Sequence, residues 1–481
     1  MEANLKDQAI NGAKWAAIEK FSLQIIQFGL GIILARLLSP SDYGTVGMLG
    51  IFIAISNTFI DSGFSSALIR KLERTEDDYS TVFFTNFAIS IAFALMLVGI
   101  APWVAKFYNM PILCPILRVQ SLSLILYALA AVQTAKLAAE VNFKTLAKAN
   151  LIAAPLSGII GIGLAYIGWG VWALVCQNLL SAALRLIFII LQCRWFPRWK
   201  FSRQSFDELW GFGKNMLGAS LLSAIYFNLD SIIIGKFFTP ASLGNYTRGT
   251  QIARLPVDNI NGVLNNVTYP VLAKLQNDTE RLIAAYRKYI KLTSMCIFFC
   301  CTLLAALAKP LILFLLTDKW INAIIYLQVF SFAIMFDHLC VINLNLIKIK
   351  GRSDLILKLE VIKRIISFAI LFAAIPFGVL GICVSKVIYT FIAVYINTYY
   401  NGKLFGMGFI SQFNDYSKYL LLSLTTCAPA LLIATLGLPN IVSLALGATI
   451  SAALYWLLLR NDDTMKEAIG LVSSRVFKKA I

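Results

Sequence analysis

Charged and amide side chains recur at helical spacing inside stretches of the chain that are otherwise apolar. Lys20, Gln24 and Gln27 are separated by four and three residues, so they share one face of a helix. A second series with the same spacings comprises Arg248, Gln251, Arg254 and Asp258. Inside a membrane such groups are costly and usually face a partner or a water-filled space. We therefore expect both series to line one hydrophilic cavity that can hold a polar cargo.

Further ionisable residues in apolar stretches could bind a coupling ion, relay a proton or balance a charge. Lys386 adds a cation to the two series, and the other candidates are Glu19, Asp61, Asp230, Asp337 and His338. The alternative for each, and for Asp258, is structural: an interhelical hydrogen bond, or an ion pair such as Arg254 with Asp258. A lone histidine in a membrane helix is more often a packed hydrogen-bonding residue than a proton relay.

The composition indicates a polytopic membrane protein. Hydrophobic residues make up 59% and charged residues 14% of the 481 residues, against about 45–50% and about 25% in ordinary globular chains. The formal net charge of +18 could suggest a nucleic-acid partner. However, the basic residues lie in short segments between apolar runs, which is the pattern that membrane topology produces. We expect membrane lipids, and no nucleic acid, as partners.

Fourteen apolar runs between residues 13 and 459 are long enough to cross a bilayer, which takes about 20 residues as a helix. Of the 42 Lys and Arg residues, 31 fall on one side of the predicted topology, five on the other and six within the runs. The group of 31 includes Lys363 and Arg364. Since Lys and Arg accumulate on the cytoplasmic side, we expect both termini in the cytoplasm. The outer connections are too short for a folded catalytic domain.

The segments Ile33–Gly44 and Ile233–Gly244 are two copies of one pattern, 200 residues apart. Each ends an apolar run with one cation, turns at Ser-Pro or Thr-Pro, and begins a new run after glycine. The cations, Arg36 and Lys236, either reach for the membrane interface or border an outward opening. Six runs separate the copies, so both face the same way, as in parallel transporter repeats.

The repeat predicts an all-α fold of two similar six-helix bundles and an appended helix pair. Residues 1–200 would hold membrane helices 1–6, and residues 201–405 would hold membrane helices 7–12. Residues 406–481 would form membrane helices 13 and 14 and a cytoplasmic tail.

The chain contains none of the usual catalytic or cofactor-binding patterns. The G-x-x-x-x-G-K-[ST] phosphate-binding loop is absent from the sequence. One histidine and such short connections do not support a Ser/His/Asp or paired-carboxylate site. Most of the nine cysteines lie in apolar runs, and no pair has zinc-ligand context. We therefore expect neither an enzyme, a cofactor nor a metal.

Three segments resemble a known family: Trp15–Lys20, Ile33–Gly44 and the stretch Asp-Ser-Gly-Phe-Ser-Ser-Ala-Leu-Ile at 61–69. They are similar to the polysaccharide-transporter branch of the multidrug/oligosaccharidyl-lipid/polysaccharide (MOP) flippase superfamily, most of all to colanic-acid and teichuronic-acid exporters. The layout of about 14 helices extends the likeness to the whole chain. The resemblance implies a bacterial inner-membrane flippase that works by alternating access in surface polysaccharide biosynthesis, such as that of lipopolysaccharide or exopolysaccharide.

The cargo that this resemblance implies is a polyprenyl-pyrophosphate-linked oligosaccharide. Buried cations such as Lys20, Arg248, Arg254 and Lys386 would offset its charge, and arginine suits forked phosphate contacts. Polysaccharide polymerases or other assembly proteins are the protein partners that the resemblance implies. A cation-coupled multidrug exporter on the same fold stays open, and would show a cavity dominated by carboxylates and aromatics. A membrane polysaccharide polymerase or ligase would need a sizeable outer loop with acid–base groups, and a channel or scaffold component is a third alternative.

Overall fold

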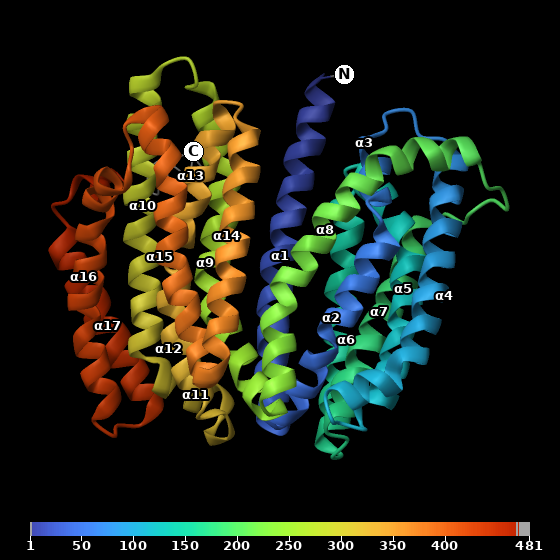
Figure 1. Ribbon diagram of the computed structural model, residues 1–481, viewed down its shortest axis with the longest axis horizontal. Coiled ribbons are helices and arrows are strands. Elements are labelled where there is room, and N and C mark those ends of the chain that lie inside the picture. Colours follow the sequence, from blue (N-terminus) through green and yellow to red (C-terminus); the bar gives the residue numbers. More distant parts are fainter. Residues whose placement is uncertain (1, 468–469, 471–481) are drawn as a thin grey trace. The chain divides into compact units, whose positions relative to one another are not determined.

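The computed structural model describes residues 2–467 and residue 470, and the described residues form long helices with no strand (Figure 1). They belong to two compact units, Met1–Gly244 and Asn245–Ile481. We refer to these as unit 1 and unit 2. The predicted boundary at residue 200 lies inside unit 1, so the assignment of the next helix to a second bundle stays a prediction.

Unit 1 is a bundle of eight helices. They are α1 (Glu2–Leu37), α2 (Pro40–Asp61), α3 (Phe64–Arg70), α4 (Glu76–Phe107), α5 (Leu113–Ala139), α6 (Phe143–Tyr166), α7 (Val171–Cys193) and α8 (Arg203–Phe237). Helix α4 packs along α5, and α6 packs against both α1 and α7. Helix α8 begins across the ends of α3 and α4 and then runs beside α2 (Figure 1).

The two sequence copies form equivalent helix starts at one end of unit 1. Ser39 caps α2: its hydroxyl accepts the backbone N–H of Asp42 at 3.3 Å, and the Asp42 carboxylate accepts the Ser39 N–H at 2.9 Å. Thr239 likewise accepts the backbone N–H of Ser242 at 3.2 Å, at the start of α9 (Pro240–Lys274). In both copies proline is the first helical residue, where its missing N–H costs no helical bond.

As far as residue 467, unit 2 contains the rest of α9 and eight further α-helices. They are α10 (Thr279–Ala306), α11 (Ala308–Leu316), α12 (Ala323–Ile334), α13 (Asp337–Ile349), α14 (Ser353–Ala374), α15 (Gly378–Phe405), α16 (Phe409–Thr435) and α17 (Asn440–Leu459). Short 3-10 turns at Asp318–Trp320 and Ile375–Phe377 precede α12 and α15. Helix α16 packs on α10, and α17 packs on α16 and α11.

A buried amide network joins four helices of unit 2. Asn343 of α13 accepts the hydroxyl of Tyr286 at 2.8 Å and exchanges two hydrogen bonds of 2.9 Å with Gln412 of α16. Asn401 of α15 donates to the Asn343 backbone carbonyl at 3.2 Å. Asn343, Asn401 and Gln412 have no exposed surface, and neither has Tyr286, so their hydrogen bonds to one another replace most of the partners that these groups would have in water. The α16–α17 pair is thereby an integral part of unit 2.

The structure confirms the all-α polytopic fold class. Among the described residues, twelve stretches are long and apolar enough to cross a membrane. One of them, Asp354–Phe405, contains both α14 and α15, and α9 with its charged residues is not among the twelve. The predicted total of about fourteen is consistent with this. The sequence predicts single apolar runs over 43–68 and 320–346. The structure divides the first into α2 and α3 and the second into α12 and α13, and the short helix α11 lies almost entirely between predicted runs.

Candidate functional site

The polar series of α1 lies beside the face that packs on α6. Glu19 accepts a 2.5 Å hydrogen bond from the Asn150 amide of α6, which gives this carboxylate a structural partner. Lys20 and Gln27 are exposed and Gln24 is half-buried. At about 100° per residue, Lys20, Gln24 and Gln27 point about 80–140° around the helix from Glu19. They are therefore available to a ligand, in contrast to Glu19.

The structure does not bring Asp61 and Asp230 together, although both are half-buried in unit 1. Asp61 ends α2, two residues before Gly63, which lies against Gly213 of α8. Asp230 lies 17 residues further along α8, about 25 Å away at the rise of a helix. The two carboxylates cannot share one ion.

The series on α9 continues into a group of charged residues within unit 2. Arg248 donates to the Gln251 side chain at 3.2 Å. Arg254 is half-buried, with its guanidinium 5.1 Å from the centre of the Phe330 ring. Asp337, in the first turn of α13, is half-buried and lies within electrostatic reach of Arg254, Asp258 and Lys363. Three separate helices thus bring charged groups to one place.

Lys363 and Arg364 are the functional candidates that the sequence analysis missed. The charge count places them in an inner connection, but Lys363 lies ten residues into α14, about 15 Å from its start. Its side chain is only 7% exposed, and its ammonium is 2.5 Å from Glu360. Arg364 is 3.4 Å from the other carboxylate oxygen of Glu360. Arg352 and Lys358 lie close to this pair in the sequence, so the whole stretch has the composition of one basic connection between helices, and the burial of Lys363 could not be predicted.

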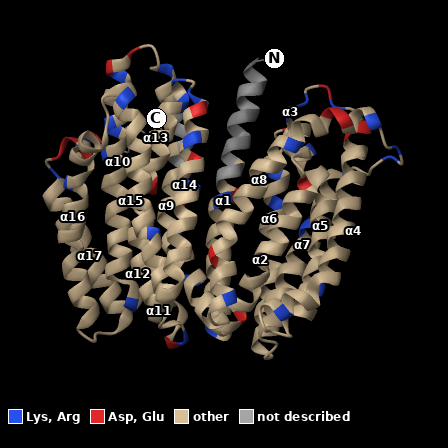
Figure 2. Ribbon diagram, in the orientation of Figure 1, with Lys and Arg blue, Asp and Glu red and all other residues tan. Residues whose placement is uncertain are grey.

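We call Arg254, Asp258, Asp337, Glu360, Lys363 and Arg364 the charge cluster of unit 2. It contains three cations and three carboxylates, whereas most other charged residues lie at the ends of the helices (Figure 2). A buried charge is tolerated only when it is paired. The cluster can therefore hold an additional ion or an anionic ligand only by exchanging one of its own pairs.

His338 of α13 has a structural environment. Its ring is fully buried, with Nδ1 2.8 Å from the Met335 carbonyl oxygen and Nε2 2.8 Å from the Ser294 hydroxyl. Because a carbonyl only accepts, Nδ1 carries the proton and Nε2 accepts from Ser294. Both nitrogens are occupied, which favours the packed hydrogen-bonding role over a proton relay.

The remaining candidates are Lys386 and the two cations of the repeat. Lys386 is half-buried on α15. The Lys236 ammonium lies 4.3 Å from the centre of the Phe107 ring and donates to the Phe107 carbonyl, so it binds the end of α4 to the end of α8. Arg36 is exposed at the end of α1. The single cavity expected to combine the α1 and α9 series stays a prediction.

No group of three or more His, Cys, Asp or Glu side chains suited to a metal ion occurs among the described residues. All nine cysteines are free thiols.

The helices form the fold of membrane transporters of the MOP superfamily. The structure of the lipid II flippase MurJ in an inward closed conformation superposes with a TM-score of 0.75 at 15% identity, covering 92% of this chain and 98% of that one. An inward-facing multidrug resistance MATE family transporter of the MOP superfamily gives a TM-score of 0.61 at 17% identity, covering 82% and 95%. At such identities the likeness establishes the fold.

The chain belongs to the polysaccharide biosynthesis protein family, whose sequence profile matches residues 33–325. It is 23% identical to the teichuronic acid biosynthesis protein TuaB of Bacillus subtilis (strain 168) over 354 residues, which is 73% of each chain. It is also 23% identical to the lipopolysaccharide biosynthesis protein WzxC of Escherichia coli (strain K12) over 379 residues, which is 75% of this chain and 74% of WzxC. These matches confirm the resemblance stated from the motifs.

Proposed function

We propose that this protein is a flippase that moves a polyprenyl-pyrophosphate-linked oligosaccharide across the bacterial inner membrane for surface polysaccharide biosynthesis. Membership of the polysaccharide biosynthesis protein family, together with a transporter fold, is the observation that carries the proposal. The cargo moves by alternating access, with both chain termini in the cytoplasm, as the excess of Lys and Arg on one side favours.

Cationic side chains at membrane depth fit the charge of such a cargo. A pyrophosphate needs several hydrogen-bond donors when it leaves water, and guanidinium groups donate in pairs to phosphate oxygens. Arg248 and Arg254 on α9, Lys20 on α1 and Lys386 on α15 are the proposed ligands. Gln24, Gln27 and Gln251 would bind sugar hydroxyls through their amides.

The charge cluster of unit 2 supports a specific mode of binding. Glu360 neutralises both Lys363 and Arg364 before any cargo is present, so a pyrophosphate would compete with Glu360 and Asp337 for the cations. Exchange of internal carboxylates for substrate phosphates keeps the charges paired in both states. It would also allow the cargo to be released, because Glu360 and Asp337 can pair with the cations again.

Complementation of a strain that lacks its polysaccharide exporter tests this function. Wild-type protein should restore surface polysaccharide, while Arg254→Ala, Lys386→Ala and Lys20→Ala at matched membrane levels should reduce export at least several-fold. Arg281→Ala is the matched control, because this arginine is exposed and its partner Asp278 is half exposed. Full export by all three variants contradicts the cationic site. Unchanged surface polysaccharide after deletion of the gene, without accumulation of lipid-linked precursor, contradicts the flippase assignment itself.

A multidrug exporter is the alternative that shares the fold. It would be expected to have a cavity dominated by carboxylates and aromatics, whereas the charge cluster of unit 2 contains as many cations as carboxylates. Membership of the polysaccharide biosynthesis protein family favours the flippase. Drug resistance conferred by the expressed chain, in the absence of any effect on polysaccharide, would favour the exporter.

Polymerases or assembly proteins of the same polysaccharide are the proposed protein partners.

A further inference from the structure

The connection between α7 and α8 has a composition found nowhere else in the chain. With the first residue of α8 included, residues 194–203 read Arg-Trp-Phe-Pro-Arg-Trp-Lys-Phe-Ser-Arg, with four cations, four aromatic residues and no acid. We call it the aromatic–cationic segment. It lies at the end of unit 1 where α4 begins and α7 ends, and it takes no part in the proposed transport site.

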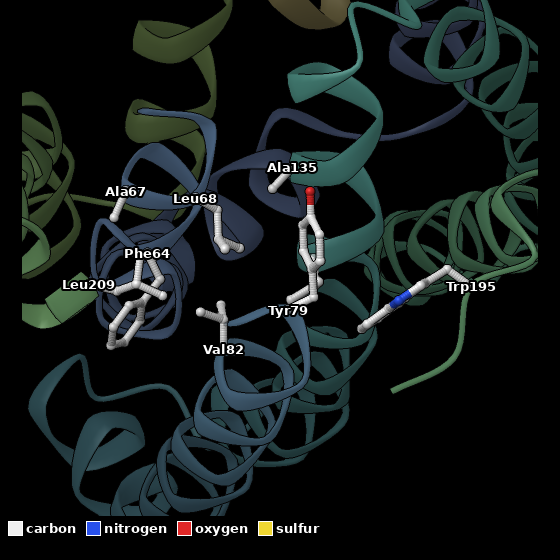
Figure 3. Close-up of a cluster of buried hydrophobic side chains, with 9 residues drawn as sticks. Phe64, Ala67, Leu68, Tyr79, Val82, Ala135, Trp195 and Leu209 are labelled. Atoms are coloured by element: carbon white, nitrogen blue, oxygen red, sulfur yellow. The ribbon is translucent and has the colours of Figure 1, made fainter. Parts of the chain in front are cut away.

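Trp195 anchors this segment in the core of unit 1. Its side chain is 6% exposed, and its indole N–H donates to the Glu76 carboxylate at 2.7 Å. The indole packs edge-on against Tyr79 at a centroid distance of 5.9 Å (Figure 3). The Lys136 ammonium lies 5.3 Å from the Tyr79 ring centre and 5.7 Å from that of Trp195. One side chain of the segment is thus held by packing, a hydrogen bond and a cation–π contact.

The backbone of the segment is fixed along the first turns of α4. The Arg198 N–H donates to the Ser80 hydroxyl at 2.9 Å, and the Ser202 N–H donates to the Thr81 hydroxyl at 3.0 Å. Ser80 and Thr81 are both buried. A loop that is held by two buried hydroxyls and one buried indole has a set orientation, so its other side chains present one defined surface.

That surface is aromatic and strongly exposed. Trp199 is 95% exposed, Phe196 69% and Phe201 54%, and the Trp199 ring lies 5.4 Å from the ring of Phe84 in α4. Tryptophan is stable in the headgroup region of a bilayer, where one edge of the ring contacts hydrocarbon and the other contacts water, and phenylalanine beside it adds apolar area that can enter the acyl boundary. The surface therefore points to a lipid partner.

Two of the four cations of the segment pair with carboxylates. Lys200 lies 2.5 Å from Asp77 and Arg203 lies 3.2 Å from Asp207. Lys71 binds both Asp78 at 3.0 Å and Glu208 at 2.9 Å. Within the described part of the chain, Arg194 and Arg198 form no ion pair, and both are exposed.

We propose that the aromatic–cationic segment binds anionic phospholipid headgroups of the cytoplasmic leaflet. Trp199, Phe196 and Phe201 enter the interface, and Arg194 and Arg198 bind the headgroup phosphates. Basic residues close to a membrane surface each strengthen binding to anionic lipid about five-fold. The bound lipid would fix the start of α8 relative to α4 and α7, since the segment is the direct connection between α7 and α8.

Native mass spectrometry tests the proposal on the full chain, purified in detergent micelles that also contain phosphatidylglycerol and phosphatidylcholine. The wild type should retain phosphatidylglycerol in preference to phosphatidylcholine, and Arg194→Gln/Arg198→Gln should lower this preference about ten-fold or more. The matched control is Lys106→Gln/Lys319→Gln, which removes the same charge elsewhere. Arg198→Gln alone serves if the double variant does not fold, and should lower the preference about five-fold.

Two further measurements identify the bound ligand. Trp199→Ala should also reduce retention while Trp199→Phe preserves it, and Trp169→Ala, which removes a 50% exposed tryptophan from the α6–α7 connection, should have no effect. Displacement of phosphatidylglycerol by excess inorganic phosphate would overturn the lipid assignment in favour of a free-phosphate site. Equal lipid retention by wild type and by the folded arginine variant would overturn the proposal altogether.

Discussion

Gly44 of α2 lies directly against the backbone of Pro240, the first residue of α9. A β-carbon on Gly44 would be 1.7 Å from the Pro240 carbonyl oxygen. The reciprocal pair has the same geometry, since a β-carbon on Gly244 would be 1.9 Å from the Pro40 carbonyl oxygen. The two sequence copies therefore contact each other at Gly44 and Gly244, so the segments that repeat in the sequence also pack together.

Replacing either glycine should destabilise unit 1. In Gly44→Ala or Gly244→Ala the obstructing atom is a backbone carbonyl, so the helix starts must separate, at a cost of about 1–3 kcal/mol or more. Gly50→Ala on the same helix is the control, because the nearest atom to its added β-carbon is 3.7 Å away. Thermal unfolding in detergent should show a lower midpoint for both crossing variants and no loss for Gly50→Ala. Equal midpoints for all three would contradict the close approach.

The ion pair of Arg287 and Asp415 should be a main support of the α16–α17 pair. Two nitrogens of Arg287 lie 2.8 Å from the two oxygens of Asp415, whose side chain is 2% exposed. Asp415→Asn should lower the free energy of unfolding by about 1.5–3 kcal/mol, the range for hydrogen bonds to charged groups. Arg281→Gln, which loses an exposed pair, should cost less than about 1 kcal/mol. Denaturant titration of both variants measures the difference, and a larger loss for Arg281→Gln would refute the prediction.

Glu360 should be the most sensitive position of the charge cluster. Glu360→Gln leaves Lys363 and Arg364 without their shared carboxylate inside the bundle, and stranding a buried charge costs about 3–5 kcal/mol. In Glu360→Gln/Lys363→Met the buried ammonium is gone, so part of the loss should be recovered. A double-mutant cycle on thermal stability checks this coupling. Additive effects of the two substitutions would show that the pair does not interact.

Asp462 should make unit 2 sensitive to acid. Partial burial alone would raise the pKa of its carboxyl, but the hydrogen bond and the charge of Lys418 lower that pKa overall, together with the Thr464 N–H and the Tyr419 hydroxyl. A depressed pKa favours the folded state above the unfolded value of 3.8, and this contribution is lost as the pH falls through the folded pKa. Asp462→Asn should therefore unfold at a lower temperature than wild type at pH 6. The difference in unfolding temperature should shrink as the pH falls below about 3.8. A difference that is independent of pH would rule out the depressed pKa of Asp462 as its cause.

Much of this fold can be predicted from the sequence because the bilayer restricts what an apolar run can become. Runs of about 20 apolar residues must be helical, since backbone groups find no other partners in lipid. The repeat at Pro40 and Pro240 likewise marks two helix starts, because proline and a Ser or Thr cap have one favourable arrangement there. The break at residues 335–336 between α12 and α13 carries no comparable signal, so the sequence predicts one continuous span there.

The charge cluster could be predicted only in part. Arg254 belongs to a polar series at helical spacing that also contains Asp258, and Asp337 lies in an apolar run, so the sequence predicts that these three residues lie inside the helix bundle. Lys363 carried no such signal, because a lysine one helical turn from other basic residues looks the same whether it faces water or a neighbouring helix. Which face of α14 turns inward is decided by α13 and α15, and the pattern of α14 alone does not contain that information. The same holds for the crossing of Gly44 and Gly244, which only the assembled helices create.

The order in which the chain is synthesised gives the amide network a consequence for biogenesis. Tyr286 and Asn343 leave the ribosome long before Gln412, and Arg287 long before Asp415. Until α16 has inserted, unit 2 therefore holds an arginine and a buried amide without their final partners. A nascent or truncated chain that ends at residue 405 should be recognised by membrane quality-control proteases, whereas the completed chain should resist them. Insertion of α16 and α17 would thus be the step that makes unit 2 resistant to these proteases.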